Sequence, residues 1–317
     1  MPVRAESQPH RTPVVVTVAR LVAGATLLVV CAVSLWWWAI GGRWYIVRTP
    51  SMGTYAPVGT LLWVKPANIR DLHVGDVITF HPPPIGTSTG GRTKPAVSVI
   101  SQTYTHRVVA RDPDGTLQTK GDLNGVRDPW RTDQGHLVGR VTARWPAVGW
   151  LVEAFPVLVP GALLLWVLTS LFASNRARVP WRVVGTALLV ATAIYVYNPL
   201  FGARQVSFVP LGRAGAKATY VGTGLMPIRL QAQGAHPVLV HAGQERSIVA
   251  TQPGQLGLFQ VHVVPTIPWQ TWVVIASACL APAVWSVIVG VEPPPAHRRR
   301  KRRPPGTAPK TPQLQPS

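Results

Sequence analysis

The chain has 317 residues, of which 47% are hydrophobic, a formal net charge of +20 and a mean hydropathy of +0.20. The length allows one to three domains, and the positive hydropathy is unusual for a water-soluble protein. Its two cysteines, Cys31 and Cys279, both lie in apolar stretches. They exclude a disulfide framework and a cysteine-based zinc site in the polar parts of the chain.

Four apolar segments divide the chain, at residues 14–40, 148–173, 183–201 and 267–291. In the first, the stretch from Leu21 to Ile40 carries no charge, and about twenty such residues suffice to cross a bilayer as a helix. Tryptophans gather near the ends of these segments, as indole rings do at a bilayer interface; they include Trp36, Trp37, Trp38, Trp150, Trp181, Trp269 and Trp272. The first segment is too long for a typical cleaved signal peptide and lacks a small-residue cleavage site. The sequence therefore predicts four transmembrane helices.

Two stretches between these segments have β character. Residues 41–147 and 202–266 contain short runs of Val, Ile, Leu and Thr that Gly and Pro interrupt, with no long helical period. Such runs are typical of strands joined by turns. We therefore expect a mixed membrane protein with a β-rich domain over 41–147 and a second, small β-rich insert over 202–266.

The charge distribution predicts the orientation. Residues 1–13, the loop at 174–182 and the tail at 292–317 are basic and would share one side of the membrane. The positive-inside rule places that side in the cytoplasm. Both β-rich stretches then lie outside the cytoplasmic membrane, and the basic, Pro-rich tail is expected to be disordered. This reading makes the tail a topology signal or a lipid contact, and it argues against nucleic acid as a partner.

Three short stretches carry groups for nucleophilic catalysis. Ser51 follows Pro50 just beyond the first apolar segment, His106 lies in a run with strand character, and Asp122 and Asp128 lie in a turn-like segment. A serine hydroxyl needs a base within hydrogen-bond reach, and a histidine backed by a carboxylate is suited to that task.

These stretches resemble the type I signal peptidases, in the branch of the endoplasmic reticulum, archaea and some Gram-positive bacteria. Four segments carry the resemblance: Pro50-Ser51-Met52, Val74-Gly75-Asp76-Val77-Ile78-Thr79-Phe80, Thr105-His106-Arg107-Val108-Val109, and Lys120-Gly121-Asp122-Leu123-Asn124 followed by Asp128. The better-known bacterial branch has a lysine at the place that His106 holds here. The resemblance spans roughly residues 48–141.

The resemblance implies a membrane-bound serine endopeptidase that removes signal peptides from exported pre-proteins. Ser51 would be the nucleophile, His106 the general base and Asp128 the carboxylate behind it, while Asp122 would hold the turn or share that role. The backbone N–H of Ser51 and the Thr49 hydroxyl would form the oxyanion hole. It implies no cofactor or metal, and it makes signal peptides, the lipid bilayer and the export translocon the candidate partners.

Two departures from the family pattern leave alternatives open. Relatives continue Ser-Met-x-Pro-Thr, whereas here Gly53-Thr54-Tyr55-Ala56-Pro57 follows Met52, and the insert at 202–266 has no counterpart. The chain could instead be a non-catalytic, export-associated scaffold with a degenerate peptidase domain, or a peptidase dedicated to a few substrates. The weaker readings are a Ser/Lys dyad that uses Lys65 and a metal site; the histidines that would serve the latter are His236, His241 and His262.

Overall fold

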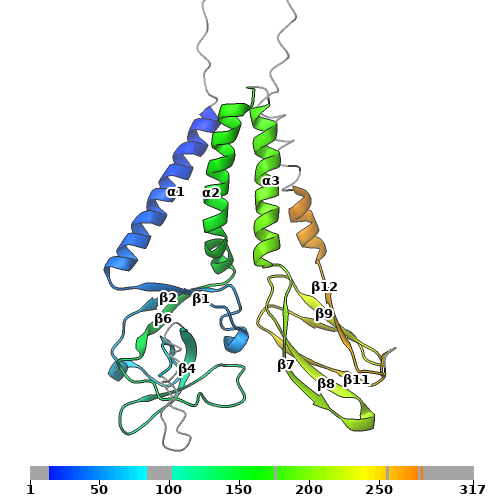
Figure 1. Cartoon of the computed structure of the whole chain (residues 1–317). Helices are drawn as coiled ribbons and strands as arrows, with labels where there is room; N and C mark the ends of the chain where they lie inside the picture. Colours follow the sequence, from blue (N-terminus) through cyan, green and yellow to red (C-terminus); the bar gives the residue numbers. More distant parts are fainter. Residues whose placement is uncertain (1–13, 84–101, 175–176, 255–256, 278–279, 281–317) are drawn as a thin grey trace, which may run out of the picture. The chain divides into compact units, whose positions relative to one another are not determined.

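The computed structural model describes residues 14–83, 102–174, 177–254, 257–277 and 280, and Figure 1 shows their helices and strands. The chain divides into two compact units, Met1–Ile267 and Pro268–Ser317. The first unit holds every named element. In the second, the description covers a helix over residues 269–277 and the helical residue Leu280.

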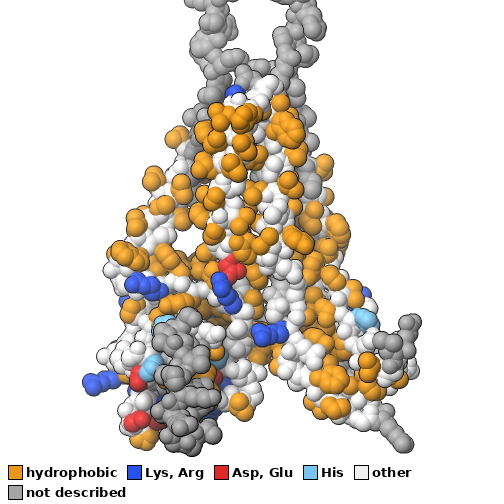
Figure 2. Space-filling view, viewed as in Figure 1, with side chains coloured by type: hydrophobic (Ala, Val, Ile, Leu, Met, Phe, Trp, Pro, Cys, Tyr) orange, Lys and Arg blue, Asp and Glu red, His pale blue; other side chains and the backbone are white. Residues whose placement is uncertain are grey.

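Three long helices belong to the first unit: α1 (Val14–Ala39), α2 (Val148–Phe172) and α3 (Arg178–Tyr197). Large hydrophobic side chains cover their outer surfaces, as Figure 2 shows. Arg178 and Arg182, at the start of α3, donate hydrogen bonds to groups in the last turns of α2, including the Ser170 carbonyl and hydroxyl oxygens. These arginines place positive charge at the carbonyl end of α2, where the helix dipole favours it.

The expectation of four transmembrane helices is wrong. Among the described residues, two helices are long and apolar enough to cross a membrane: α2, and α3 from Pro180 to Tyr197. In α1, the described residues give a shorter apolar helix, Gly24–Ala39. Most of the segment at 267–291, like residues 1–13 and the tail at 292–317, lies outside the described residues.

The region between α1 and α2 forms one antiparallel sheet of six strands in the order β1-β2-β6-β3-β4-β5. The strands are β1 (Arg43–Ile46), β2 (Leu61–Lys65), β3 (Val77–Phe80), β4 (Tyr104–Arg111), β5 (Leu117–Lys120) and β6 (Leu137–Trp145); two 3₁₀ turns, η1 (Pro50–Met52) and η2 (Ile69–Asp71), interrupt the connections. β3 is buried along its whole length, because β4 and β6 flank it and core side chains cover it. This strand fixes the register of β4, pairing Ile78 with His106.

The core of this domain consists of two clusters. One gathers Met52, Leu62 and Val64 with their neighbours, and the other gathers Leu72, Ile78, Phe80, Val108 and Leu117. Phe80 is fully buried, and its ring lies edge-on to that of His106 with the centroids 6.3 Å apart. The side chain of His106 therefore packs directly on the core.

The insert after α3 folds as two three-stranded antiparallel sheets, β10-β9-β12 and β11-β8-β7. Its elements are β7 (Ala203–Pro210), η3 (Gly212–Ala214), β8 (Ala216–Gly222), β9 (Ile228–Ala232), β10 (Val238–Val240), β11 (Glu245–Ala250) and β12 (Val261–Pro265). Ile228 and Leu230 from one sheet and Ile248 from the other share one buried cluster. The insert is thus a small sandwich with its own core.

Removing the Phe80 ring should destabilise the sheet domain, because the cavity would open in its best-buried strand. Phe80→Ala is expected to lower the free energy of unfolding by about 3–5 kcal/mol. The matched control is Val74→Ala, whose side chain is exposed and whose effect should stay within about 0.5 kcal/mol. Denaturant unfolding followed by tryptophan fluorescence checks this, and equal effects of the two variants would contradict the packing described here.

Candidate active site

Ser51 lies in η1, within a loop that we call the nucleophile loop, residues 47–60. Two backbone hydrogen bonds close its neck, from the Val47 N–H to the Thr60 carbonyl (3.0 Å) and from the Gly59 N–H to the Val47 carbonyl (2.8 Å). Pro50 occupies the first position of η1, where its fixed φ suits a helical turn and its missing N–H leaves no bond unmade. The closed neck makes the loop a defined element that begins at the end of β1 and returns at β2.

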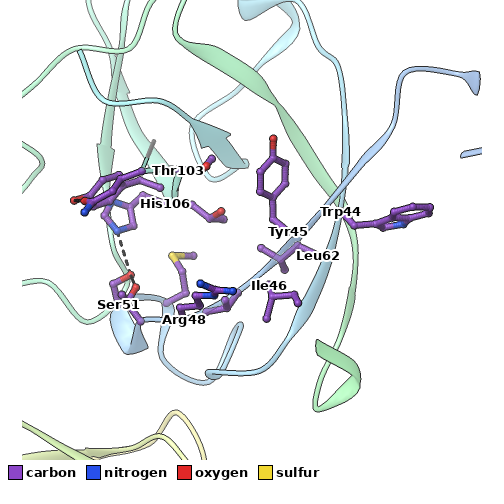
Figure 3. A pocket seen from close by; sticks show the side chains of 14 residues that line it. Trp44, Tyr45, Ile46, Arg48, Ser51, Leu62, Thr103 and His106 are labelled. Atoms are coloured by element: carbon purple, nitrogen blue, oxygen red, sulfur yellow. Dashed lines mark hydrogen bonds between the residues drawn. The ribbon is translucent and has the colours of Figure 1, made fainter. Parts of the chain in front are cut away.

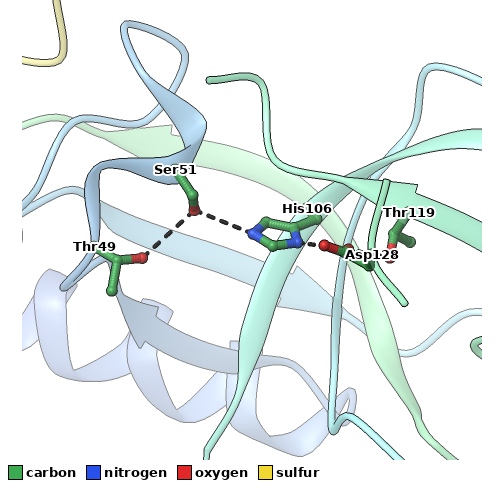
Figure 4. Close-up of polar contacts among 5 residues, drawn as sticks. All are labelled: Thr49, Ser51, His106, Thr119 and Asp128. Carbon is green, nitrogen blue, oxygen red and sulfur yellow. Dashed lines mark hydrogen bonds and ion pairs between the residues drawn. The ribbon is translucent and has the colours of Figure 1, made fainter. Parts of the chain in front are cut away.

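His106 projects from β4 toward this loop. Its side chain is 5% exposed, and its Nε2 lies 3.1 Å from the Ser51 Oγ. Figure 4 shows the imidazole between Ser51 on one side and Asp128 on the other. The structure therefore joins residues that are 55 positions apart in the sequence.

Asp128 lies behind the imidazole. Its Oδ2 is 2.7 Å from the His106 Nδ1, and the Thr119 hydroxyl donates a second hydrogen bond to the same oxygen at 2.5 Å. A neutral imidazole that donates its Nδ1–H to this carboxylate presents the lone pair of Nε2 to Ser51. This is the tautomer that a general base for Ser51 requires.

Asp122 is not in contact with His106. Both of its carboxylate oxygens accept hydrogen bonds from the Arg107 guanidinium, at 2.8 and 2.7 Å, and Arg107 also donates to the Gly75 carbonyl. The hydrogen bond from Arg107 to Asp122, together with the charge of Asp122, raises the pKa of the guanidinium above its ordinary value. Of the two carboxylates that the sequence offered, Asp128 thus lies behind the base and Asp122 holds the turn.

The turn that contains Asp122 supports the serine through backbone contacts. The Leu123 N–H donates to the Ser51 carbonyl at 2.9 Å, and the Asn124 N–H closes the turn on the Gly121 carbonyl. A Cβ at Gly121 would lie 3.0 Å from the Ser51 Cβ and closer still to the Asn124 side chain. A glycine at 121 therefore lets the turn approach Ser51 closely.

Two arginines hold the middle of the nucleophile loop. The guanidinium carbons of Arg107 and Arg144 lie 4.8 and 4.3 Å from the centre of the Tyr55 ring, and Arg144 also donates to the Tyr55 carbonyl. Cation–π contacts of this kind are worth roughly 0.5–2 kcal/mol each. Arg107 links this tyrosine to Asp122 and so connects the loop with the turn beneath Ser51.

The first turns of α2 hold the neck of the loop. The Gly149 N–H donates to the Gly59 carbonyl at 2.9 Å, and the Trp150 indole packs so closely that a Cβ at Gly59 would overlap it. Near the other end of the loop, the Arg48 Nε donates to the Glu153 carboxylate at 3.0 Å. These contacts therefore hold the nucleophile loop against the first turns of α2.

Thr49 lies beside the nucleophile, with its hydroxyl 3.5 Å from the Ser51 Oγ. Ser51 itself stands in the first turn of η1, where backbone N–H groups have no partner within the helix. The two groups that the sequence suggested for an oxyanion hole, the Ser51 N–H and the Thr49 hydroxyl, therefore both lie at Ser51.

A pocket of about 620 Å³ opens next to these groups. Residues 44–49 form one wall and residues 102–106 another, with Ser51, Met52 and Leu62 completing it. Figure 3 shows Ser51 and His106 together at one end, with Tyr45 and Leu62 toward the other. The strand that supplies much of the first wall, β1, is an edge strand of the sheet.

The structure does not bring together the residues of the two alternative sites that the sequence suggested, the Ser/Lys dyad and the metal site. Lys65 is exposed on β2, where it pairs with Arg140 of β6, and the side chain that contacts the Ser51 Oγ is His106. His236, His241 and His262 are exposed, and the described part of the chain contains no group of three or more His, Cys, Asp or Glu residues arranged to hold a metal ion.

The sequence analysis assigned no role to several residues that support the site. They are Thr119, Arg107, Leu123, Tyr55 and Glu153. Arg107 adjoins the base in the sequence, and its charge within a strand-like run was the one available signal. The others act through contacts between segments far apart in the chain, so no local pattern marks them.

No family model matches the chain, and no curated protein matches it.

Replacing Thr119 with valine should measure the support given to Asp128. Thr119→Val removes the hydroxyl that donates to a buried carboxylate, and we expect a loss of about 1–3 kcal/mol in the free energy of unfolding. Thr79→Val is the matched control, because Thr79 is equally buried but bonds only to the Thr105 hydroxyl, a neutral bond worth about 1 kcal/mol. Denaturant titrations that rank the control as the more damaging variant would contradict the support that the Thr119 hydroxyl gives to Asp128.

Proposed function

We propose that this protein is a membrane-bound serine endopeptidase that cleaves signal peptides from exported pre-proteins. The observation that carries the proposal is the continuous line of contacts from the Ser51 Oγ to the His106 Nε2 (3.1 Å) and from the His106 Nδ1 to the Asp128 Oδ2 (2.7 Å). A hydroxyl, an imidazole and a carboxylate in this order are the parts of a hydrolytic triad, whatever the fold that holds them.

The chemistry follows from this arrangement. As the Ser51 Oγ attacks the scissile carbonyl carbon, its proton passes to the His106 Nε2, and Asp128 stabilises the imidazolium. The negative charge on the carbonyl oxygen is met by the Ser51 N–H and the Thr49 hydroxyl. His106 then protonates the leaving amine, which departs and leaves an acyl ester on Ser51. A water molecule that loses its proton to His106 hydrolyses this ester, releasing the acid and restoring the serine.

The pocket suits an extended peptide segment. β1 lies at the sheet edge and leads directly into the nucleophile loop, so a substrate strand laid along it would carry its backbone toward Ser51. Tyr45, Ile46 and Leu62 would line the path of the residues that precede the cleaved bond. Small side chains at the cleavage site remain an expectation from the resemblance to signal peptidases.

The helices support a membrane location. In α2 and α3 only 6% of the most apolar window is buried, and large apolar surfaces of this kind are stable against lipid and not against water. Arg178 and Arg182 lie in the first turns of α3, next to the short connection between the two helices, and the positive-inside rule puts that end of the helices in the cytoplasm. The sheet domain and the insert then share the outer face of the membrane, the side on which an exported chain emerges.

Cleavage of an exported pre-protein by the detergent-solubilised protein tests the proposal. Wild type should release the signal peptide, and Ser51→Ala and His106→Ala should each lose about 10³-fold or more in kcat/KM. His106→Lys should also be inactive, because Asp128 would hold the ammonium in its charged form. If wild type fails to cleave, or Ser51→Ala cleaves equally well, the peptidase proposal falls and the scaffold function gains support.

The two carboxylates should differ sharply in the same assay. Asp128→Asn leaves His106 without a carboxylate at Nδ1, and a loss of roughly 10²–10⁴-fold in kcat is expected from the wrong tautomer. Asp122→Asn only loosens the turn beneath Ser51 and should cost about tenfold, since small displacements of a nucleophile reduce the rate moderately. Asp112→Asn, which breaks the Arg131 ion pair, is the control and should leave activity unchanged. A larger loss from Asp122→Asn than from Asp128→Asn would contradict the assignment.

A further inference from the structure

The insert touches the nucleophile loop through the backbone of one of its turns. Gly243, in the turn between β10 and β11, is buried, and a Cβ built on it would lie 2.3 Å from the Gly53 carbonyl oxygen and 3.0 Å from the Thr54 nitrogen. The turn backbone therefore rests directly against the Gly53–Thr54 peptide. Gly53 ends η1, and its N–H donates to the Pro50 carbonyl at 2.9 Å.

The turn that makes this contact is firmly held by the insert. The Gln244 N–H donates to the His241 carbonyl, closing the turn, and the Gly243 N–H donates to the Gly222 carbonyl at the end of β8 at 2.7 Å. The Gly222 N–H in turn donates to the Gln244 carbonyl. With φ at +70°, Gly243 adopts a left-handed conformation that favours glycine. The turn is thus a rigid projection of the sandwich.

Gly53 lies between this turn and the catalytic domain. A Cβ on Gly53 would lie 3.0 Å from the Leu123 side chain and 3.4 Å from the Gly243 carbonyl oxygen. Leu123 is the residue whose N–H holds the Ser51 carbonyl. Two turns, one from each β-rich domain, therefore hold the residue that ends the helical turn of the nucleophile.

We infer that the insert is a structural part of the active site, with Gly243 a positioning residue for Ser51. This inference rests on the proposed function. The turn at 241–244 limits the movement of Gly53, and through η1 it keeps the Ser51 Oγ within hydrogen-bond distance of the His106 Nε2. A nucleophile held in an attack-ready position raises kcat and leaves substrate binding largely unchanged.

Gly243→Ala tests the inference through steady-state kinetics on a pre-protein substrate. The added methyl group would push the Gly53 carbonyl away, and we expect kcat to fall roughly 10–100-fold with KM within about twofold of wild type. Gly257→Ala is the matched control, because Gly257 has nearly the same φ (+71°) but no atom within 4 Å of an added Cβ. Its kcat should stay within about twofold of wild type, since only local backbone strain is added. Equal kcat values for the two variants, or a change in KM alone, would overturn the positioning role.

A cross-linking measurement keeps the inference testable if Gly243→Ala folds poorly. In full-length protein with Cys31 and Cys279 replaced by alanine, Thr54→Cys combined with Ala242→Cys should be joined by a short bis-maleimide. The control pair, Thr54→Cys with His236→Cys, places the second cysteine beyond the opposite end of β10 and should react far less. Cross-linking no better than that of the control pair would overturn the contact without reference to activity.

If wild type does not cleave, the proposed function fails and the positioning role fails with it; if wild type cleaves and Gly243→Ala matches it, only the positioning role fails.

Discussion

The buried contact between Asp128 and His106 is the constraint on which the site depends. A carboxylate with a side chain only 5% exposed must be matched by hydrogen-bond donors, because burying an unpaired polar group is costly. Asp128 finds them in the His106 imidazole and the Thr119 hydroxyl, which come from neighbouring strands. The backbone adds to this match, because the Asp128 N–H donates to the Thr119 carbonyl. The pairing of β4 with β5 therefore decides where the His106 imidazole meets this carboxylate.

The nucleophile needs a different kind of support, because it lies on a loop. The loop is closed at its neck, bonded to Leu123 beneath Ser51, held between two arginines at Tyr55 and fixed to α2 through Gly149. Each of these contacts is weak alone, and together they leave the loop few alternative conformations. A preorganised serine reacts faster than one that must be ordered at each turnover.

Close backbone approach explains why glycines surround the serine. Gly121 lies against Ser51 and Gly53 lies against Leu123, while Gly59 meets Trp150. The departure from the Ser-Met-x-Pro-Thr pattern has a physical explanation. The glycine after Met52 ends η1 with a positive φ of 53°, and it leaves room for the turn of the insert. The unusual loop sequence and the additional domain are therefore two parts of one arrangement.

Local sequence patterns predicted some elements and missed others for identifiable reasons. The strands β2, β3, β4 and β6 contain the runs of Val, Ile, Leu and Thr from which the sequence predicted β structure over 41–147. β1 and β5 have four residues each and carry arginine, glutamine or lysine, so pairing with their neighbours, and not their own pattern, makes them strands. Apolar composition marked the long helices, but it predicted four membrane-crossing helices where the described residues show two that are long and apolar enough.

The sequence by itself determined the chemical groups: a serine after a proline, a histidine in a strand and two aspartates in a turn. It also determined two β-rich domains next to long apolar helices. Only the tertiary structure decided that Asp128 lies behind His106 while Asp122 bonds Arg107, and that the insert reaches Gly53. The reason is that turn residues six positions apart look alike in sequence. Their roles differ because the β4–β5 register aims one carboxylate inward at the imidazole and the other at a guanidinium near the surface.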